Sequence, residues 1–207
     1  MEKEFLNLLR TRLDAERYRH TLAVADTGEL IARRLYAENK LTNSPDEDSF
    51  IYRVRQAALL HDYAKNMAPA ELRELAEEAR DSWQIDNEEM EMPVVLHAPV
   101  SAYLARRDLG IEDQEVLEAI RYHTIGSPEM GIIARIIFVA DYIEPNRTFS
   151  AVEQIRDELY NNGLESAIIK TCDLTIKYHL GKGSLVHYNT LRLRNACLRR
   201  QQMWRKR

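Results

Sequence analysis

Apolar residues recur along most of the chain at the three- and four-residue spacing of an amphipathic α-helix. In residues 16–36 the inward stripe is formed by His20, Val24, Thr27, Ile31 and Leu35, while charged residues occupy the positions between them. A helix that packs one face against a core has this pattern. The sequence therefore predicts a long helix whose apolar face carries a histidine.

The same periodicity predicts further helices, separated by polar or proline- and glycine-containing segments. They cover about residues 50–62, 69–80, 93–107, 113–124, 131–144, 150–162, 164–180 and 188–204. Pro69 suits the first turn of its helix, Asp113 is an expected N-cap, and Ser150 with Glu153 forms an expected capping box. Residues 38–50 have the composition of a loop. Because no segment alternates as a strand does, we expect an all-α orthogonal helical bundle.

Length and composition favour one domain. The chain has 207 residues, of which 45% are hydrophobic and 30% charged, and its net charge is -4. We expect residues 1–207 to form a single domain in which residues 188–207 are a basic C-terminal helix. An acidic protein has no overall attraction for nucleic acid. The arginines and lysine of residues 192–207 are therefore interpreted as a solvated helix end rather than an RNA-binding arm.

The sequence also predicts where the protein is found. The longest apolar run, residues 131–143, is interrupted by Arg135 and is too short to span a bilayer. The first residues alternate charged and apolar side chains, unlike a secretory signal. Cys172 and Cys197 lack metal-binding spacing and are expected to be buried thiols. These features predict a cytoplasmic protein.

Side chains of the kinds that bind metals recur on the predicted inner helix faces. They are His20, the adjacent pair His61 and Asp62, His97, His123 and Asp141. Each alone has an ordinary explanation, because a single histidine on an apolar face is more often a hydrogen-bonded core residue. Together they place four of the six histidines and two carboxylates in apolar surroundings, where an isolated carboxylate is costly. A bound metal ion would remove this cost.

Six ligands of imidazole and carboxylate type predict two metal ions rather than one. Because the set contains no thiolate, it suits iron, manganese, cobalt or zinc. The expected ligands of the first ion are His20, His61, Asp62 and Asp141, and those of the second are Asp62, His97 and His123. In this arrangement Asp62 bridges the two ions, and a hydroxide held between them is the expected nucleophile.

Five segments carry a resemblance to a known family: RYRHTLAVA, AALLHDYAKN, VLHAPV, AIRYHTIG and FVADYIEPNR. Over residues 5–188 they resemble the HD-domain superfamily and, within it, the YqeK branch of symmetrical bis(5'-nucleosyl)-tetraphosphatases. The resemblance implies a dinuclear, iron-binding hydrolase that cleaves diadenosine tetraphosphate into two ADP. It places the family's metal ligands on the six residues above and its nucleotide contacts on Lys65, Thr124 and Arg147, with Arg17 as a further candidate. Ile125 and Ala98 depart from the family pattern beside the ligands, where threonine and glycine are expected.

The expected reaction is the metal-dependent hydrolysis of a phosphoanhydride. Asp62 and Lys65 are the expected catalytic residues, with Lys65 reaching the phosphates as a point charge. Arg147 either makes a bidentate phosphate contact or forms an ordinary ion pair with Glu144 or Glu153. A dinucleoside polyphosphate is the expected partner, with no membrane or nucleic acid, and the sequence leaves a homodimer open. His179 and His187 fall outside the ligand set and are interpreted as surface or capping residues.

Two other functions stay open at this stage. The first is an HD phosphohydrolase that acts on another nucleotide, although a single-metal nucleotidase would not need His97 and His123 in the site. The second is a metal-stabilised module that binds RNA or a ribosomal particle through the basic C-terminal segment. Salt-dependent nucleic-acid binding that survives mutation of the metal ligands would distinguish this module from an enzyme.

Overall fold

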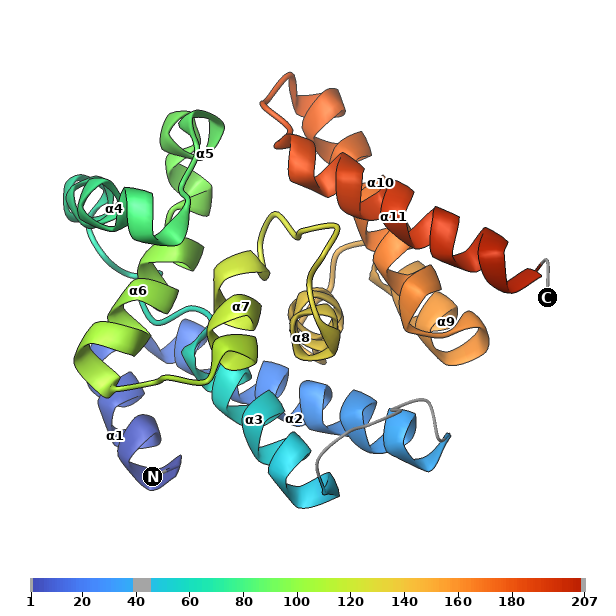
Figure 1. Cartoon of the computed structure of the whole chain (residues 1–207), viewed down its shortest axis with the longest axis horizontal. Helices are drawn as coiled ribbons and strands as arrows, with labels where there is room; N and C mark the ends of the chain where they lie inside the picture. Colours follow the sequence, from blue (N-terminus) through green and yellow to red (C-terminus); the bar gives the residue numbers. More distant parts are fainter. Residues whose placement is uncertain (1, 39–45, 206–207) are drawn as a thin grey trace.

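The computed structural model describes residues 2–38 and 46–205, which form a bundle of helices (Figure 1). In this part of the chain the elements are α1 (Glu2–Arg12), α2 (Ala15–Ala37), α3 (Glu47–Leu60), α4 (Pro69–Trp83), α5 (Asn87–Glu91), a 3-10 turn (Pro93–Val95), α6 (His97–Leu109), α7 (Gln114–Tyr122), α8 (Ile132–Ile143), α9 (Val152–Asn162), α10 (Leu164–Lys182) and α11 (Tyr188–Arg205). The described residues contain no strand, which confirms the all-α prediction. Residues 39–45 of the predicted loop lie outside the described residues.

Helix α8 forms the centre of the core. Eight of its 12 residues are buried, because α2, α3, α7, α9 and α10 all pack against it. Figure 1 shows α8 end-on between α7 and α9. A helix that is apolar on all sides needs neighbours on all sides, and the sequence of α8 meets this condition. The packing leaves Asp141, near the end of α8, among the ends of other helices.

Helix α2 lies close against α3 and α8. A Cβ atom on Gly28 would lie 3.2 Å from Val54 Cγ1 of α3 and 3.5 Å from Ile137 Cδ1 of α8. The predicted inward stripe of α2 is buried at His20, Val24, Ile31 and Leu35, whereas Thr27 is partly exposed. The small residue at position 28 therefore lets the histidine-bearing helix approach the helices that carry the other candidate ligands.

The predicted helix boundaries are partly confirmed. Pro69 begins α4, and Asp113 caps α7 by accepting hydrogen bonds from the backbone N–H groups of Glu115 and Val116. The predicted capping box at Ser150 is wrong, because α9 begins at Val152 after Ala151, which makes no side-chain cap. The helix predicted from residue 93 is a short 3-10 turn followed by α6, which begins at His97.

The C-terminal helices α10 and α11 pack against each other along their length (Figure 1). Leu193 and Cys197 of α11 are completely buried. Two of the basic residues of α11 pair within the protein, Arg194 with Asp173 and Arg200 with Glu165. Helix α11 is therefore part of the packed core, and not all of its basic residues point to solvent.

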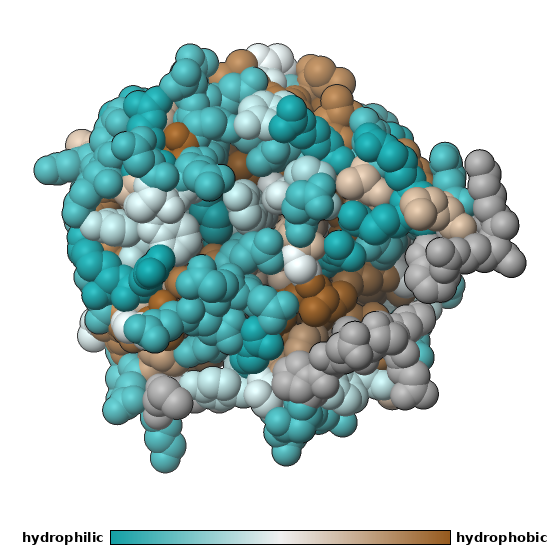
Figure 2. Space-filling view, viewed as in Figure 1, coloured by the Kyte–Doolittle hydropathy of each residue, from teal (hydrophilic) through white to brown (hydrophobic). Residues whose placement is uncertain are grey.

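Both cysteines are buried and free, as predicted, and burial raises the pKa of each thiol. Within the described residues, none of the helices has the length and apolar character needed to cross a membrane. The face of the molecule seen in Figure 2 is mainly hydrophilic, with smaller hydrophobic areas between the polar side chains.

Candidate metal centre

The six predicted ligands come together from five helices. His20 lies on the buried face of α2, and Asp141 lies in the last turn of α8. The other four lie at helix ends: His61 and Asp62 directly follow α3, His97 begins α6, and His123 directly follows α7. Four of these side chains are no more than 3% exposed, namely those of His61, Asp62, His97 and His123, and His20 is 6% exposed. The polar residues that the sequence places on apolar helix faces thus come together in one site.

Hydrogen bonds fix which ring nitrogen each histidine presents to the site. The Nδ1 atoms of His61, His97 and His123 lie 2.6–2.9 Å from the carbonyl oxygens three residues earlier, those of Ala58, Val94 and Ile120. His20 Nδ1 lies 3.1 Å from Glu144 Oε1. A carbonyl or carboxylate oxygen only accepts, so each Nδ1 is the protonated nitrogen. In each ring Nε2 is therefore the nitrogen that faces inward.

The four Nε2 atoms surround the two carboxylates. His61 Nε2 lies 3.4 Å and His20 Nε2 3.8 Å from Asp62 Oδ2. His97 and His123 face the other oxygen, Asp62 Oδ1, at 3.2 and 3.5 Å. His20 Nε2 is also 3.1 Å from Asp141 Oδ1. Asp62 therefore lies between two pairs of imidazoles, with one oxygen toward each pair.

The hydrogen-bond partners of the Nε2 atoms indicate whether this cluster suits a metal ion. The Nε2 atoms of His20 and His61 are buried and make no hydrogen bond; although His20 Nε2 is close to Asp141, their contact lacks hydrogen-bond geometry. His97 Nε2 and His123 Nε2 lie 3.1 Å apart, and with both protons on Nδ1 their lone pairs face each other. Lys65 and Thr124 can donate to His97 Nε2, but His20 Nε2 and His61 Nε2 have no donor. Buried acceptors without donors are unfavourable unless a cation lies between them. The residues therefore fit a divalent metal.

The ligand atoms fall into overlapping groups, in each of which all atoms lie within 4.8 Å of one another. One group is His20, His61 and Asp62; another is His61, His123 and Asp141; a third is Asp62, His97 and His123. Three neutral or anionic donors in such a group suit imidazole- and carboxylate-binding metals. More than one group of residues in the site could hold an ion.

The protonation states also suit metal binding. Burial lowers the pKa of His97 to about 4, which keeps its imidazole neutral at neutral pH. Burial alone raises the pKa of Asp62, but the surrounding imidazoles outweigh it and hold the pKa well below the usual value. Burial likewise raises the pKa of Asp141, and the contacts with His20 and Arg147 outweigh this and lower it. Both carboxylates are therefore ionised.

Similarity to known proteins shows the family of this chain. A model of the HD domain matches residues 17–146, which include all six candidate ligands. The chain belongs to the HD-domain family. Relatives from Halalkalibacterium halodurans, Bacillus subtilis and Staphylococcus aureus, each named symmetrical bis(5'-nucleosyl)-tetraphosphatase, are 37%, 35% and 33% identical to this chain. These alignments cover 95%, 91% and 89% of this chain and 97%, 92% and 88% of the relatives. The chain therefore belongs to this YqeK-type branch.

A solved structure of an HD-domain protein has the same fold. It comes from Clostridium acetobutylicum and is described as a predicted HD superfamily hydrolase involved in NAD metabolism. It superposes on this chain with a TM-score of 0.84 at 32% identity, and the match covers 97% of this chain and 98% of the other. The predicted HD-domain helical bundle is thereby confirmed.

Four cationic or hydroxyl side chains border the metal centre of this HD-domain protein. Lys65 Nζ and Thr124 Oγ1 each lie 3.2 Å from His97 Nε2. Arg17 Nη1 lies 2.8 Å from Asp62 Oδ2. Arg147 Nη2 lies 2.6 Å from Asp141 Oδ1. All four side chains thus contact a candidate ligand. Burial lowers the pKa of Lys65.

Of the two predicted ion-pair partners of Arg147, the structure supports Glu144 and excludes Glu153. Its guanidinium does not pair with Glu153, which binds Arg156 instead. It contacts the side chain and the backbone carbonyl of Asp141, and only more distantly, at 3.8 Å, Glu144. The side chain is 35% exposed. Arg147 therefore lies at the boundary between the metal centre and solvent.

An open hollow of about 330 Å³ leads to the His20 side of this centre. Its lining includes Arg17 and Arg147, together with Arg19, Glu144 and Asn146. Sequence reasoning did not select these last three as site residues. Glu144 and Asn146 lie in the same segment as Arg147, ADYIEPNR, which was a signal that could have found them. Three arginines around one hollow suit an anionic ligand.

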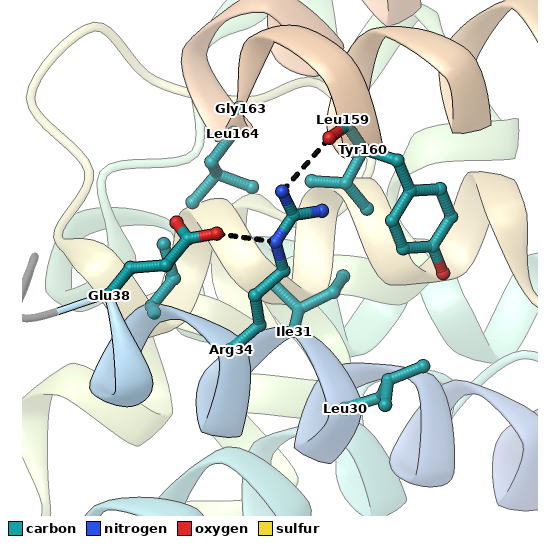
Figure 3. A pocket seen from close by; sticks show the side chains of 9 residues that line it. Leu30, Ile31, Arg34, Glu38, Leu159, Tyr160, Gly163 and Leu164 are labelled. Carbon is teal, nitrogen blue, oxygen red and sulfur yellow. Dashed lines mark hydrogen bonds and ion pairs between the residues drawn. The ribbon is translucent and has the colours of Figure 1, made fainter.

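A second hollow lies away from the metal centre and has no matching chemistry. It measures about 90 Å³ and lies between α2, α9 and α10. Figure 3 shows its apolar lining, with Arg34 bound to Glu38 and to the backbone carbonyl of Tyr160. Its charged side chains are thus already paired with each other or with the backbone. The reactive groups of the HD domain lie elsewhere.

A third polar cluster joins α5 to the start of α11. His187 Nε2 lies 3.2 Å from Asp86 Oδ2, and the hydroxyl of Tyr188 donates to the same oxygen. Glu89 is bound by both terminal nitrogens of Arg121 at 2.6–2.7 Å. The prediction of His187 as a surface residue is wrong, because its side chain is buried. The alternative of a capping residue is confirmed, since His187 Nδ1 accepts from the backbone N–H of Asn189.

Proposed function

We propose that this chain is a metal-dependent bis(5'-nucleosyl)-tetraphosphatase that hydrolyses diadenosine tetraphosphate symmetrically into two ADP. The observation that carries the proposal is the position of Asp62 between two pairs of inward-facing imidazoles. The names of three relatives that match nearly the whole chain support the substrate. The arginines around the adjoining hollow supply the charge that a polyphosphate needs.

The proposed ligands divide between two divalent ions, with iron as the proposed metal. His20, His61, Asp62 and Asp141 would hold one ion, and Asp62, His97 and His123 the other. The opposite directions of the two Asp62 oxygens support a bridging role for this residue. When bound, the ions would supply Lewis acidity, which lowers the pKa of water and neutralises charge on phosphate.

The residues around the ligands have proposed roles on the polyphosphate. Arg17 and Arg147 would bind nonbridging phosphate oxygens, and Thr124 would donate a hydrogen bond. Lys65 would place its ammonium group near the reacting phosphate. In the reaction, a water oxygen bonds to one inner phosphorus while the oxygen linking the two inner phosphates leaves with the second half. One water is consumed, and the products are two ADP.

We further propose that residues 1–207 form one domain that includes the basic C-terminal helix. The burial of Leu193 and Cys197 and the ion pairs of Arg194 and Arg200 support this, because they join α11 to the same core. These pairs leave less free positive charge for an RNA-binding arm. A dinucleoside polyphosphate, rather than a nucleic acid, is the proposed partner.

The test is product analysis of diadenosine tetraphosphate by anion-exchange chromatography. Protein loaded with Fe²⁺ is expected to yield ADP as the sole nucleotide product. Asp62→Asn is expected to lower the rate by more than about 100-fold, since it removes a proposed ligand rather than a group behind one. The control Asp157→Asn changes an exposed carboxylate of α9 and should keep the rate. AMP and ATP as products would contradict symmetric cleavage, and an unchanged substrate would contradict the proposed activity.

A further inference from the structure

The histidine on α2 differs from the other three in how its ring is held. His61, His97 and His123 each bond to a carbonyl three residues earlier, so their orientation is set within their own helix end. His20 lies within α2, in its second turn, where the backbone carbonyls are used by the helix. Its Nδ1 instead meets Glu144 Oε1 at 3.1 Å, from a residue 124 positions later in the chain. Of these four rings, His20 is the one held by a carboxylate.

Glu144 is itself firmly placed. It is 1% exposed and directly follows α8, where its N–H donates to the carbonyl of Ala140. Its own carbonyl accepts from Arg156 Nη2 at 2.9 Å and from the backbone N–H of Arg147 at 2.9 Å. A buried carboxylate with a fixed backbone can hold a partner ring in one orientation.

The second carboxylate oxygen of Glu144 binds a different residue, Asn146. Oε2 accepts from the backbone N–H of Asn146 at 2.6 Å and from its side-chain Nδ2 at 2.9 Å. Both oxygens of Glu144 therefore face donors. A glutamine could satisfy only one side, because its NH₂ group would oppose either the N–H of His20 or the N–H groups of Asn146. The geometry thus requires a carboxylate at this position.

We propose that Glu144 is a positioning residue that acts on the metal centre through His20. It holds the proton of His20 on Nδ1, directs the Nε2 lone pair toward the ion, and increases the electron density of that nitrogen. A carboxylate behind a ligating histidine has this effect on metal affinity. The three carbonyl-bound histidines lack a full negative charge behind them. The proposal rests on the proposed metal-dependent function, and it adds a residue that is not itself a ligand.

The same carboxylate connects the ligand to the rim of the hollow. Oε1 holds His20, while Oε2 holds Asn146, the residue before Arg147. A change at Glu144 therefore alters the support of a proposed metal ligand and that of a proposed phosphate-binding arginine together. Loss of the carboxylate is expected to weaken metal binding first, because the contact to His20 is direct.

The first test is a titration with Mn²⁺ followed by the electron paramagnetic resonance signal of the free ion. Glu144→Gln is expected to weaken Mn²⁺ binding by about 10- to 100-fold. The control is Glu165→Gln, the same substitution at a carboxylate that pairs with Arg135 and Arg200 and not with a proposed ligand. The control should bind Mn²⁺ like the original protein. Equal affinities in the original protein and Glu144→Gln would overturn the proposal.

The second test reads the tautomer of His20 directly and does not depend on the variant folding. Long-range ¹H–¹⁵N correlation spectra of the metal-free protein, with His20 assigned by its loss in His20→Gln, should show the proton on Nδ1. A proton on Nε2 would overturn the proposal. Neither test uses diadenosine tetraphosphate, so a failure of the proposed substrate leaves these results distinguishable from a failure of Glu144.

Discussion

The protonation states of single residues in the centre depend on their burial and on the groups around them. Asp62 is 2% exposed, yet its pKa is held well below the usual value, and Arg17 Nη1 lies 2.8 Å from one of its oxygens. His97 stays neutral because burial lowers its pKa to about 4. Anionic carboxylates and neutral imidazoles are the forms that bind metals. The ability of these residues to bind a metal therefore depends on the charge states that their surroundings stabilise.

Lys65 gives a prediction at the same scale. Its ammonium lies 3.2 Å from His97 Nε2, whereas Arg147 contacts Asp141. We expect Lys65→Met to lower kcat by about 100-fold with a smaller effect on KM, because a charge placed at the reacting phosphate acts mainly in the transition state. Steady-state kinetics with diadenosine tetraphosphate measure both constants. Lys170→Met, which removes a lysine whose Nζ bonds to Gln154 away from the cluster, should leave them unchanged; an unaltered kcat in Lys65→Met would exclude a catalytic role.

At the scale of elements, helix ends place most of the ligands. His61 and His123 directly follow α3 and α7, and His97 begins α6. A side chain at a helix end can turn back to a carbonyl of its own last turn, which fixes the ring without another element. The turn after α7 must also bend sharply, because Gly126 adopts a φ of +71° beside Leu193 of α11. The helices thus provide both the ligands and the direction in which they point.

Two glycines allow the turn after α7 to be tested. Gly110 and Gly126 both have positive φ, but only Gly126 has close neighbours: a Cβ there would collide with Leu193 and lie 3.4 Å from Phe138 Cε2. Gly110→Ala is expected to lower the free energy of unfolding by about 1–2 kcal/mol through backbone strain. Gly126→Ala adds a collision and should lower it by about 2–5 kcal/mol. Urea unfolding gives both values, and equal losses would show that Leu193 does not pack tightly against this turn.

At the scale of the whole molecule, one centre joins five helices from α2 to α8. Burying two carboxylates and four imidazoles lowers stability unless their charges and lone pairs are satisfied. A metal ion bound in the folded state would satisfy them and link α2, α3, α6, α7 and α8 at one point. Metal binding and folding are therefore expected to be coupled in this protein.

This coupling predicts a thermal shift. Mn²⁺ at 100 times its dissociation constant should stabilise the fold by about 2.7 kcal/mol, which for a chain of this size raises Tm by about 5–10 °C. Differential scanning calorimetry of chelator-treated protein, with and without Mn²⁺, measures the shift. Asp62→Asn should show a much smaller response. A Tm that does not depend on Mn²⁺ would contradict a metal site in the core.

The sequence determined most of the helices and the identity of the ligand candidates. Helical periodicity, the burial of charged groups on apolar faces and the HD-family segments are local properties, and each can be read along the chain. Asp113 as a cap and the run of apolar residues in α8 belong to this class. Local rules failed at Ser150, which does not cap α9, and they did not reveal that the side chain of His187 is buried.

The tertiary structure alone decided how these residues meet. The contact between His20 and Glu144 joins positions 124 residues apart, and no periodic pattern relates them. The same is true of His187 on Asp86, because such contacts depend on how distant helices pack. Sequence patterns report which face of a helix is buried, but the direction of a side chain within the core depends on its neighbours from other helices. For this reason the ligand candidates could be selected from the sequence, and the carboxylate that contacts one of them could not.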